Sequence, residues 1–153
     1  MALKDDIALF KQLSIFEGLS EEHLRLLAFG AERRRLEKGH VLFRQGASAD
    51  SAFVVTKGHL KLLVHSASGG ERTIGETGPG TMLTEIAMIA DAERHFTATA
   101  TEESEVIRIS RMLFHRMLEE YPEVAVAIDR RLRENFSRLV EAVGSNASKF
   151  NGS

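Results

Sequence analysis

The 153-residue sequence contains no cysteine, so it can form neither a disulfide framework nor a thiolate metal site, and it offers no thiol nucleophile. Its N-terminus lacks the uninterrupted apolar run of a secretory signal, because Lys4, Asp5 and Asp6 fall among the first apolar residues. Hydrophobic residues make up 43% and charged residues 27%, a balance typical of a globular protein rather than a disordered or membrane protein. We therefore expect one soluble, cytoplasmic domain with no membrane association.

The sequence also has little excess charge of either sign. Its net charge of −2 argues against a dedicated nucleic-acid binder, since affinity for a duplex rests largely on many contacts between basic side chains and phosphates. Two basic clusters occur, at 33–35 and at 130–133. Acidic residues lie close to both, which favours solvated surface over a DNA-binding patch.

Motifs of catalysis and metal binding are missing too. The six histidines occur singly, so the paired ligands of a cupin metal site are absent. No Gly-x-Ser-x-Gly sequence frames a nucleophilic serine, and the glycines from Gly75 to Gly80 have the wrong spacing for a dinucleotide-binding loop or a P-loop. We predict that the chain is not an enzyme and uses no metal or other cofactor.

The first 30 residues predict two helices. Ile7, Phe10 and Leu13 recur every three residues, as one face of an amphipathic helix requires. In the second helix Ser20 suits the N-cap, and Gly30 marks the C-terminal end.

Residues 31–110 switch to short extended runs separated by glycine, which is typical of a small β-sandwich, roll or barrel. The Gly69-Gly70 pair suits a tight hairpin turn, where positive φ is needed. The clearest strands are expected at 41–43, 52–55, 60–64 and 106–109.

The C-terminal part is helical again. A short helix over 112–119 ends at Tyr121-Pro122, and a longer helix runs to about Val143, before a flexible polar tail at 145–153. The long helix carries a stripe with the three- and four-residue spacing of a coiled-coil seam, which predicts a parallel homodimer. The alternative is that the stripe packs on the chain's own roll. The stripe consists of Ala125, Ile128, Leu132, Asn135, Leu139 and Ala142.

The order of helices, glycine-punctuated β segment and long C-terminal helix resembles the cyclic-nucleotide-binding domain family over about residues 12–143. The segment 15–20 is similar to the family's entry to its roll. The segments 44–50 and 53–58 are similar to its paired glycine turns with a strand between them. These landmarks indicate the fold more than the activity.

The resemblance implies an α+β, mainly β fold, in which an antiparallel β-roll, or jelly roll, is flanked by N-terminal helices and a long C-terminal helix. One domain then covers 1–144, with helices at 1–30, the roll at 31–110 and helices at 111–144. Catabolite-activator-type regulators of this family add a helix-turn-helix domain, whereas here only a short polar tail follows Gly144. We therefore expect a ligand-sensing domain that signals through an unidentified protein partner and not through DNA.

The family's ligand site is a phosphate-binding cassette, and the similar stretch here is 80–100. By this resemblance, Arg94 and backbone N–H groups at the start of a short helix would bind a cyclic phosphate, while Glu85 would accept the ribose 2′-hydroxyl proton. The expected ligand is the cyclic mononucleotide cyclic AMP, or cyclic GMP. The predicted ligand-binding residues are Leu83, Thr84, Glu85, Ile86, Ala87, Arg94, His95, Phe96 and Leu139.

Three residues depart from the family pattern by adding bulk beside the phosphate. Thr84 replaces glycine, so it would narrow the cassette or require a shifted loop, because glycine permits unusual φ values. Phe96 stands where alanine is usual and could turn into the core, and His95 either bonds the phosphate or occupies a polar rim. We expect weaker binding than in an unmodified cassette. The alternative is a β-roll that binds no nucleotide and serves as a dimerisation or protein-interaction module.

Overall fold

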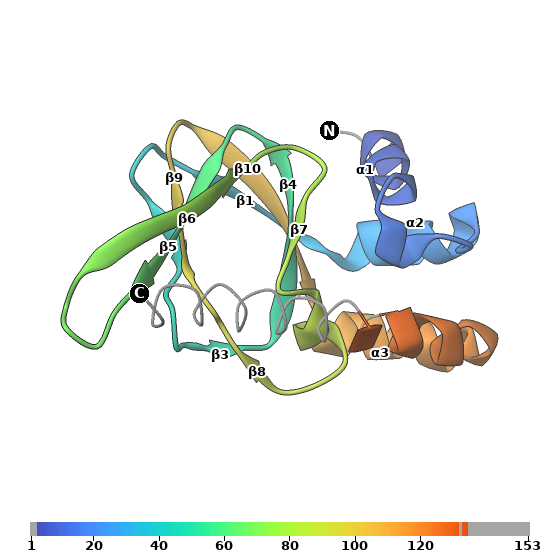
Figure 1. The fold of residues 1–153 in the computed structure, drawn as a ribbon. Helices are drawn as coiled ribbons and strands as arrows, with labels where there is room; N and C mark the ends of the chain where they lie inside the picture. The colour runs from blue at the N-terminus through green and yellow to red at the C-terminus, as the bar shows by residue number, and fades with distance from the viewer. Residues whose placement is uncertain (1–2, 132, 135–153) are drawn as a thin grey trace.

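The computed structural model describes residues 3–131, 133 and 134. Three short helical segments precede the roll and pack beside it (Figure 1). They are α1 (Leu3–Lys11), the 3-10 turn η1 (Ser14–Phe16) and α2 (Glu21–Gly30).

Both N-terminal α-helices form as the sequence predicts. α1 turns Ile7 and Phe10 into the core. α2 begins at a capping box, in which the backbone N–H of His23 donates to Ser20 Oγ at 3.3 Å and the backbone N–H of Ser20 donates to His23 Nδ1 at 3.0 Å. These bonds satisfy N–H groups that a helix start otherwise leaves without a partner.

The roll is made of two four-stranded antiparallel sheets, with strand orders β1-β10-β4-β7 and β2-β9-β5-β6. In Figure 1 the helices gather on the side of the first sheet, and the β5–β6 hairpin lies on the far side. A short ladder of β3 with β8 lies at one end of the roll. The strands are β1 (Glu32–Leu36), β2 (Val41–Phe43), β3 (Ser48–Ala49), β4 (Ser51–Lys57), β5 (Leu60–His65), β6 (Glu71–Thr77), β7 (Met82–Leu83), β8 (Ala92–Glu93), β9 (Thr97–Ala100) and β10 (Ser104–Ser110).

The first sheet separates two apolar clusters, because successive side chains of a strand point to opposite faces. On β4, Ala52 and Val54 pack with the helices, whereas Phe53 and Val55 pack with residues of the second sheet. We call the first group the outer cluster and the second the inner cluster, which fills the space between the two sheets.

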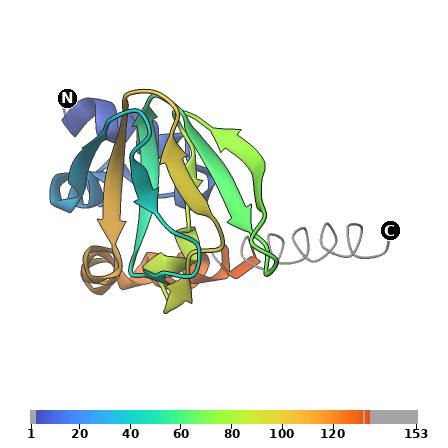
Figure 2. The same cartoon turned by 90° about the vertical axis from the view of Figure 1, so that its left-hand side faces the viewer.

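The C-terminal helices lie at the end of the roll that carries the cassette. α3 (Arg111–Glu120) contacts α2 and the short 3-10 helix η2 (Glu85–Met88). Figure 2 shows η2, β8 and α3 gathered at this end. The chain breaks at η3 (Pro122–Val124), as the Tyr121-Pro122 pair predicts, and residues 125–131 and 133–134 are helical again.

The stripe predicted to form a dimer seam lies partly inside the monomer. Ile128 is fully buried and belongs to the outer cluster, so at this position the stripe packs on its own chain. The homodimer therefore stays a prediction that rests on the later stripe positions. Those positions, Leu132, Asn135, Leu139 and Ala142, lie outside the described residues, as does the tail at 145–153.

The predicted fold class, a mainly β roll with helices at both ends, is confirmed. Strands form at all four expected places, as β2, β4, β5 and β10. No apolar run marks β1, β6 or β9, whose residues are charged, exposed or small. Within the described residues, every helix is too short or too polar to span a bilayer.

Candidate functional site

Arg94 lies between β8 and β9 and is only 5% exposed. Its Nη1 donates to the carbonyl oxygen of Ser51 at 2.8 Å, and its Nη2 donates to Ser51 Oγ at 3.2 Å. The guanidinium carbon lies 4.5 Å from the ring centre of Phe43 and 5.2 Å from that of Phe53, within the range of cation–π attraction. Strands of both sheets therefore hold this side chain in place.

No described side chain neutralises the charge of Arg94 by direct contact. None of the described carboxylates forms an ion pair with Arg94, and Asp50, whose negative charge acts on Arg94, is itself paired with Arg108 at 3.2 Å. Burial lowers the pKa of Arg94 to about 10; Asp50 acts to raise it, while repulsion from Arg108 and Arg34 adds to the lowering. The group remains charged at neutral pH, and a buried charge is costly unless an anion balances it.

Arg94 lines a cavity of about 380 Å³ at the cassette end of the roll. Within the part of the chain that the structure describes, three further arginines and one carboxylate, Asp50, line the cavity. The arginines are Arg34, Arg44 and Arg108, and the remaining lining residues are Leu42, Phe43, Ala47, Ser48, Ser51 and Phe53. The cavity is thus strongly cationic, with an aromatic wall.

Thr84 precedes η2 in the left-handed region, with φ 58° and ψ 48°. It is the one residue other than glycine with positive φ among the described residues. A β-branched side chain is strained in this conformation, which glycine adopts freely. Thr84 therefore keeps the backbone conformation of a glycine at this position and stores local strain.

Glu85 starts η2 but does not line the cavity of Arg94. It lines a separate hollow of about 300 Å³, between residues 12–15 and 80–82. Glu85 and Arg94 thus line separate hollows, and their joint action on one ligand stays a prediction.

His95 and Ile86 line a third hollow, of about 820 Å³, together with Arg133 of the C-terminal helix. Phe96 is partly buried against the inner cluster, with its ring centre 5.6 Å from that of Phe43. The hypothesis that Phe96 turns into the core agrees with this packing.

Two of the other predicted site residues are described, and both are buried. Leu83 is buried on β7, and Ala87 is buried in η2, at 5% and 0% exposure. Leu139 lies outside the described residues.

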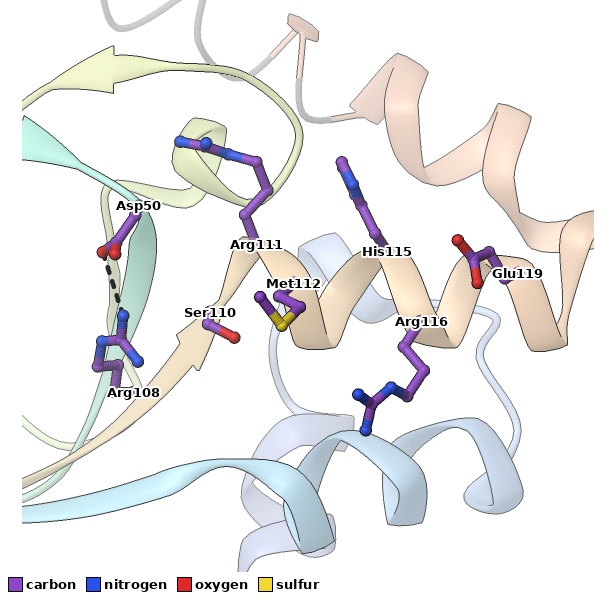
Figure 3. Close-up of a pocket in the computed structure, with 8 residues that line it drawn as sticks. All are labelled: Asp50, Arg108, Ser110, Arg111, Met112, His115, Arg116 and Glu119. Carbon is purple, nitrogen blue, oxygen red and sulfur yellow. Dashed lines mark ion pairs between the residues drawn. The ribbon is translucent and has the colours of Figure 1, made fainter.

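A further hollow, of about 790 Å³, follows the first turns of α3 and shares Asp50 and Arg108 with the cavity of Arg94 (Figure 3). Arg111 extends from the start of α3 toward the cassette. Its Nε donates to the carbonyl of Ala87 at 2.9 Å, and its Nη2 donates to the carbonyl of Ala49 at 2.7 Å. One side chain thus ties α3 to η2 and β3.

Sequence reasoning missed most of the residues around Arg94. Arg34 belongs to the cluster interpreted as solvated surface, and Ser51 and Arg108 carried no recognisable motif. Only the pairing of β1, β10 and β4 brings these side chains together, and strand register between distant segments has no local signal in one sequence.

The antiparallel roll, the short helix at one end and the buried arginine beside it together define a β-roll domain with a cationic site. A comparison with protein families agrees: the profile described as "Cyclic nucleotide-binding domain" matches residues 33–121. The chain belongs to this family.

Similar proteins include isolated domains and larger chains. A solved cyclic nucleotide-binding-like protein from Brucella abortus is 47% identical, with a TM-score of 0.70 over 75% of this chain and 98% of that one. The cyclic AMP receptor protein of Thermus thermophilus is 30% identical over 78% of this chain and 57% of its own length. The neuropathy target esterase sws of Drosophila grimshawi is 30% identical over 73% of this chain, which spans only 8% of that esterase.

Proposed function

We propose that the chain is a regulatory domain that binds a cyclic mononucleotide, cyclic AMP foremost, and that Arg94 binds the phosphate. The observation that carries this proposal is the buried guanidinium of Arg94, which lies beside the cassette without a described carboxylate in contact. A cyclic phosphate supplies the missing negative charge, and a planar guanidinium donates several directed hydrogen bonds to phosphate. Binding, rather than catalysis, is the role that this arrangement supports.

Support for cyclic AMP comes from the relative named as a cyclic AMP receptor protein. Cyclic GMP is the second candidate. Contacts to the base are expected near Leu139, whose apolar side chain offers no hydrogen bond to an exocyclic amine, so we expect only modest selectivity between the two purines. Glu85 would accept a hydrogen bond from the ribose 2′-hydroxyl of the same ligand. Because Glu85 and Arg94 line separate hollows, we propose that the cassette moves when the ligand binds.

The proposal extends to the output of the domain. We propose a homodimer along the C-terminal helix and a protein partner that receives the signal. DNA is not a proposed partner. The cluster at 33–35 supports the last point, because Arg33 binds Asp6 and Arg34 binds Glu32, so neither is a free cation for a phosphate backbone.

Equilibrium binding of a fluorescent cyclic AMP analogue tests the proposal, with competition by cyclic AMP, cyclic GMP and 2′-deoxy cyclic AMP. Arg94→Met keeps the length and apolar stem of the side chain while removing its charge, and we expect it to weaken binding about ten- to a hundredfold. Glu85→Ala should weaken cyclic AMP binding less than Arg94→Met does. The loss should be smaller still for 2′-deoxy cyclic AMP, which lacks the hydroxyl that Glu85 is proposed to bind. If Arg94→Met binds the nucleotide as tightly as the wild type does, the proposed role of Arg94 is contradicted.

The second candidate function is a protein-interaction module without a nucleotide. The packing of Phe96 against Phe43 in the inner cluster favours it, because this ring adds bulk inside the roll. The Phe96→Ala variant separates the two functions. If Phe96→Ala gains or tightens nucleotide binding, Phe96 narrows a nucleotide site. If neither the wild type nor Phe96→Ala binds nucleotide at millimolar concentration, the interaction module is favoured.

A further inference from the structure

The cavity around Arg94 holds more positive charge than one cyclic phosphate can neutralise. Arg34, Arg44, Arg94 and Arg108 line it, and among the described residues Asp50 is the one carboxylate that does. A cyclic mononucleotide brings one negative charge. Its binding at Arg94 would leave Arg44 as a cation on the cavity with no ion pair to a described residue, because Arg34 pairs with Glu32 and Arg108 pairs with Asp50.

Strand register explains why Arg34 and Arg108 face this cavity. Arg34 on β1 lies opposite Val106 on β10, and Arg108 on β10 lies opposite Phe53 on β4. Directly opposite residues share a face of a sheet, and both Val106 and Phe53 belong to the inner cluster. The two arginines consequently project from the inner face of the first sheet, at the end where Arg94 lies.

The guanidinium groups lie close enough to repel one another. The guanidinium carbons of Arg34 and Arg94 lie 5.7 Å and 5.2 Å from the centre of the same Phe53 ring. After burial, repulsion from Arg108 and Arg34 contributes to the lowered pKa of Arg94. Glu32 offsets part of this charge, since it accepts a hydrogen bond from Arg34 at 2.8 Å and lies 3.8 Å from Arg108.

Arg44 carries the positive charge that no described carboxylate balances. Its side chain is exposed on the cavity and forms no ion pair with any of the described residues, whereas Asp50 is already paired with Arg108 at 3.2 Å. An anionic group could therefore bind Arg44 without breaking an existing ion pair.

We infer that this cavity prefers a nucleotide with a second phosphate group, which Arg44 binds while Arg94 binds the first. The inference rests on the proposed function, since Arg94 binds the first phosphate as proposed, and it extends the ligand class to nucleotides with a second phosphate. Cyclic dinucleotides and nucleoside 3′,5′-bisphosphates share this chemistry. Because Arg44 is exposed, its contribution to affinity should fall as ionic strength rises.

Isothermal titration with cyclic AMP, cyclic di-AMP and adenosine 3′,5′-bisphosphate tests the inference and distinguishes the two sources of a second phosphate. We expect at least one of the two-phosphate ligands to bind the wild type about tenfold more tightly than cyclic AMP, and Arg44→Gln to remove about tenfold of that preference. The matched control is Arg25→Gln, which removes an equal charge from an exposed position on α2, where Arg25 pairs with Glu21 at 3.7 Å.

Two results would overturn the inference: two-phosphate ligands that bind no more tightly than cyclic AMP, or an Arg44→Gln variant that weakens all three ligands equally. In either case the proposed function stands as long as cyclic AMP binds through Arg94. If the wild type binds none of the three ligands, the proposed function fails together with the inference.

Discussion

Thr84 is the residue at which a departure from the family pattern has a visible physical consequence. Its φ of 58° places a β-branched residue in the left-handed region, which costs roughly 1–2 kcal/mol. The backbone nevertheless keeps this conformation, so neighbouring contacts hold it there. Ala87 supplies one of them, since its N–H donates to the carbonyl of Thr84 at 3.1 Å.

Replacing this residue with glycine should release the strain. Thr84→Gly is expected to raise the free energy of unfolding by about 1 kcal/mol, since the gain exceeds the entropic cost of glycine in the unfolded chain. The control Thr73→Gly, on the exposed strand β6, should lower it by about 0.5–1 kcal/mol. Urea denaturation measures both, and destabilisation of similar size in the two variants would contradict the account.

The sequence predicted which residues belong to the candidate site better than it predicted how their side chains are arranged. The pattern around Glu85 and Arg94 identified both, yet it could not show that they line separate hollows in this structure. That separation depends on the path of η2 and on the bonds from Arg94 to Ser51, a residue 43 positions away in the chain. Contacts across such a distance leave no periodic or local signal.

At the scale of elements, Arg111 joins the cassette to the C-terminal helices. It donates to the carbonyls of Ala87 in η2 and Ala49 in β3, both in buried residues, and to Asp91 at 2.9 Å. Figure 3 shows Arg111 reaching toward η2, whereas Arg116, one turn later on α3, points toward α2. The position of η2 is thus coupled to the start of α3 through one side chain.

Removal of Arg111 should leave buried carbonyl groups without a donor. We expect Arg111→Ala to lower the free energy of unfolding by about 2 kcal/mol. Arg116→Ala, which removes the same charge from an exposed position on the same helix, should change it by less than about 0.5 kcal/mol. Thermal or urea denaturation compares the two variants, and similar small effects would show that Arg111 does not hold the cassette.

A charge network attaches α1 to the first sheet. Arg33 on β1 donates to both carboxylate oxygens of Asp6 on α1, at 2.7 and 2.6 Å, and also to Glu105 on β10. Burial acts to raise the pKa of Glu105, but a hydrogen bond from Thr56 at 2.7 Å and the charge of Arg33 outweigh it and lower the pKa below its ordinary value.

This pKa shift predicts the pH dependence of stability. Because the folded pKa of Glu105 is lowered, its contribution is complete above the ordinary value of 4.5 and is lost as the pH falls through the folded value. Glu105→Gln should lower the free energy of unfolding by about 1–2 kcal/mol at pH 7 and make the loss of stability below pH 4.5 shallower. Glu102→Gln, at an exposed site, is the control. An unchanged acid dependence in Glu105→Gln would contradict the role of this network.

For the whole molecule, the fold was the most predictable feature. The change from helical periodicity to short extended runs, with glycine at the turns, is visible in the sequence and fixes the order of helices and roll. Sheet order was not visible, because β6 and β9 lack apolar runs and the pairing of β1 with β10 joins the two ends of the β segment. Such pairing is decided by tertiary packing rather than by local propensity.

The assembly is predicted to be a homodimer along the C-terminal helix. Ile128 is buried in the monomer, so the contacts must come from the later positions of the stripe and from exposed residues such as Val126, which is 71% exposed. Light scattering at tens of micromolar, as an order-of-magnitude test concentration, should give twice the chain mass of 17.0 kDa. The mass of a single chain would contradict the dimer.

The central claim is that the buried charge of Arg94 binds the phosphate of a cyclic nucleotide. Isothermal titration of the wild type with cyclic AMP, repeated with Arg94→Ala and Arg25→Gln, tests it most directly. We predict measurable heat for the wild type and Arg25→Gln, and an affinity about ten- to a hundredfold weaker for Arg94→Ala, with circular dichroism confirming that the variant is folded. No heat with wild-type protein at millimolar cyclic AMP, or equal affinity in a folded Arg94→Ala variant, would contradict the account.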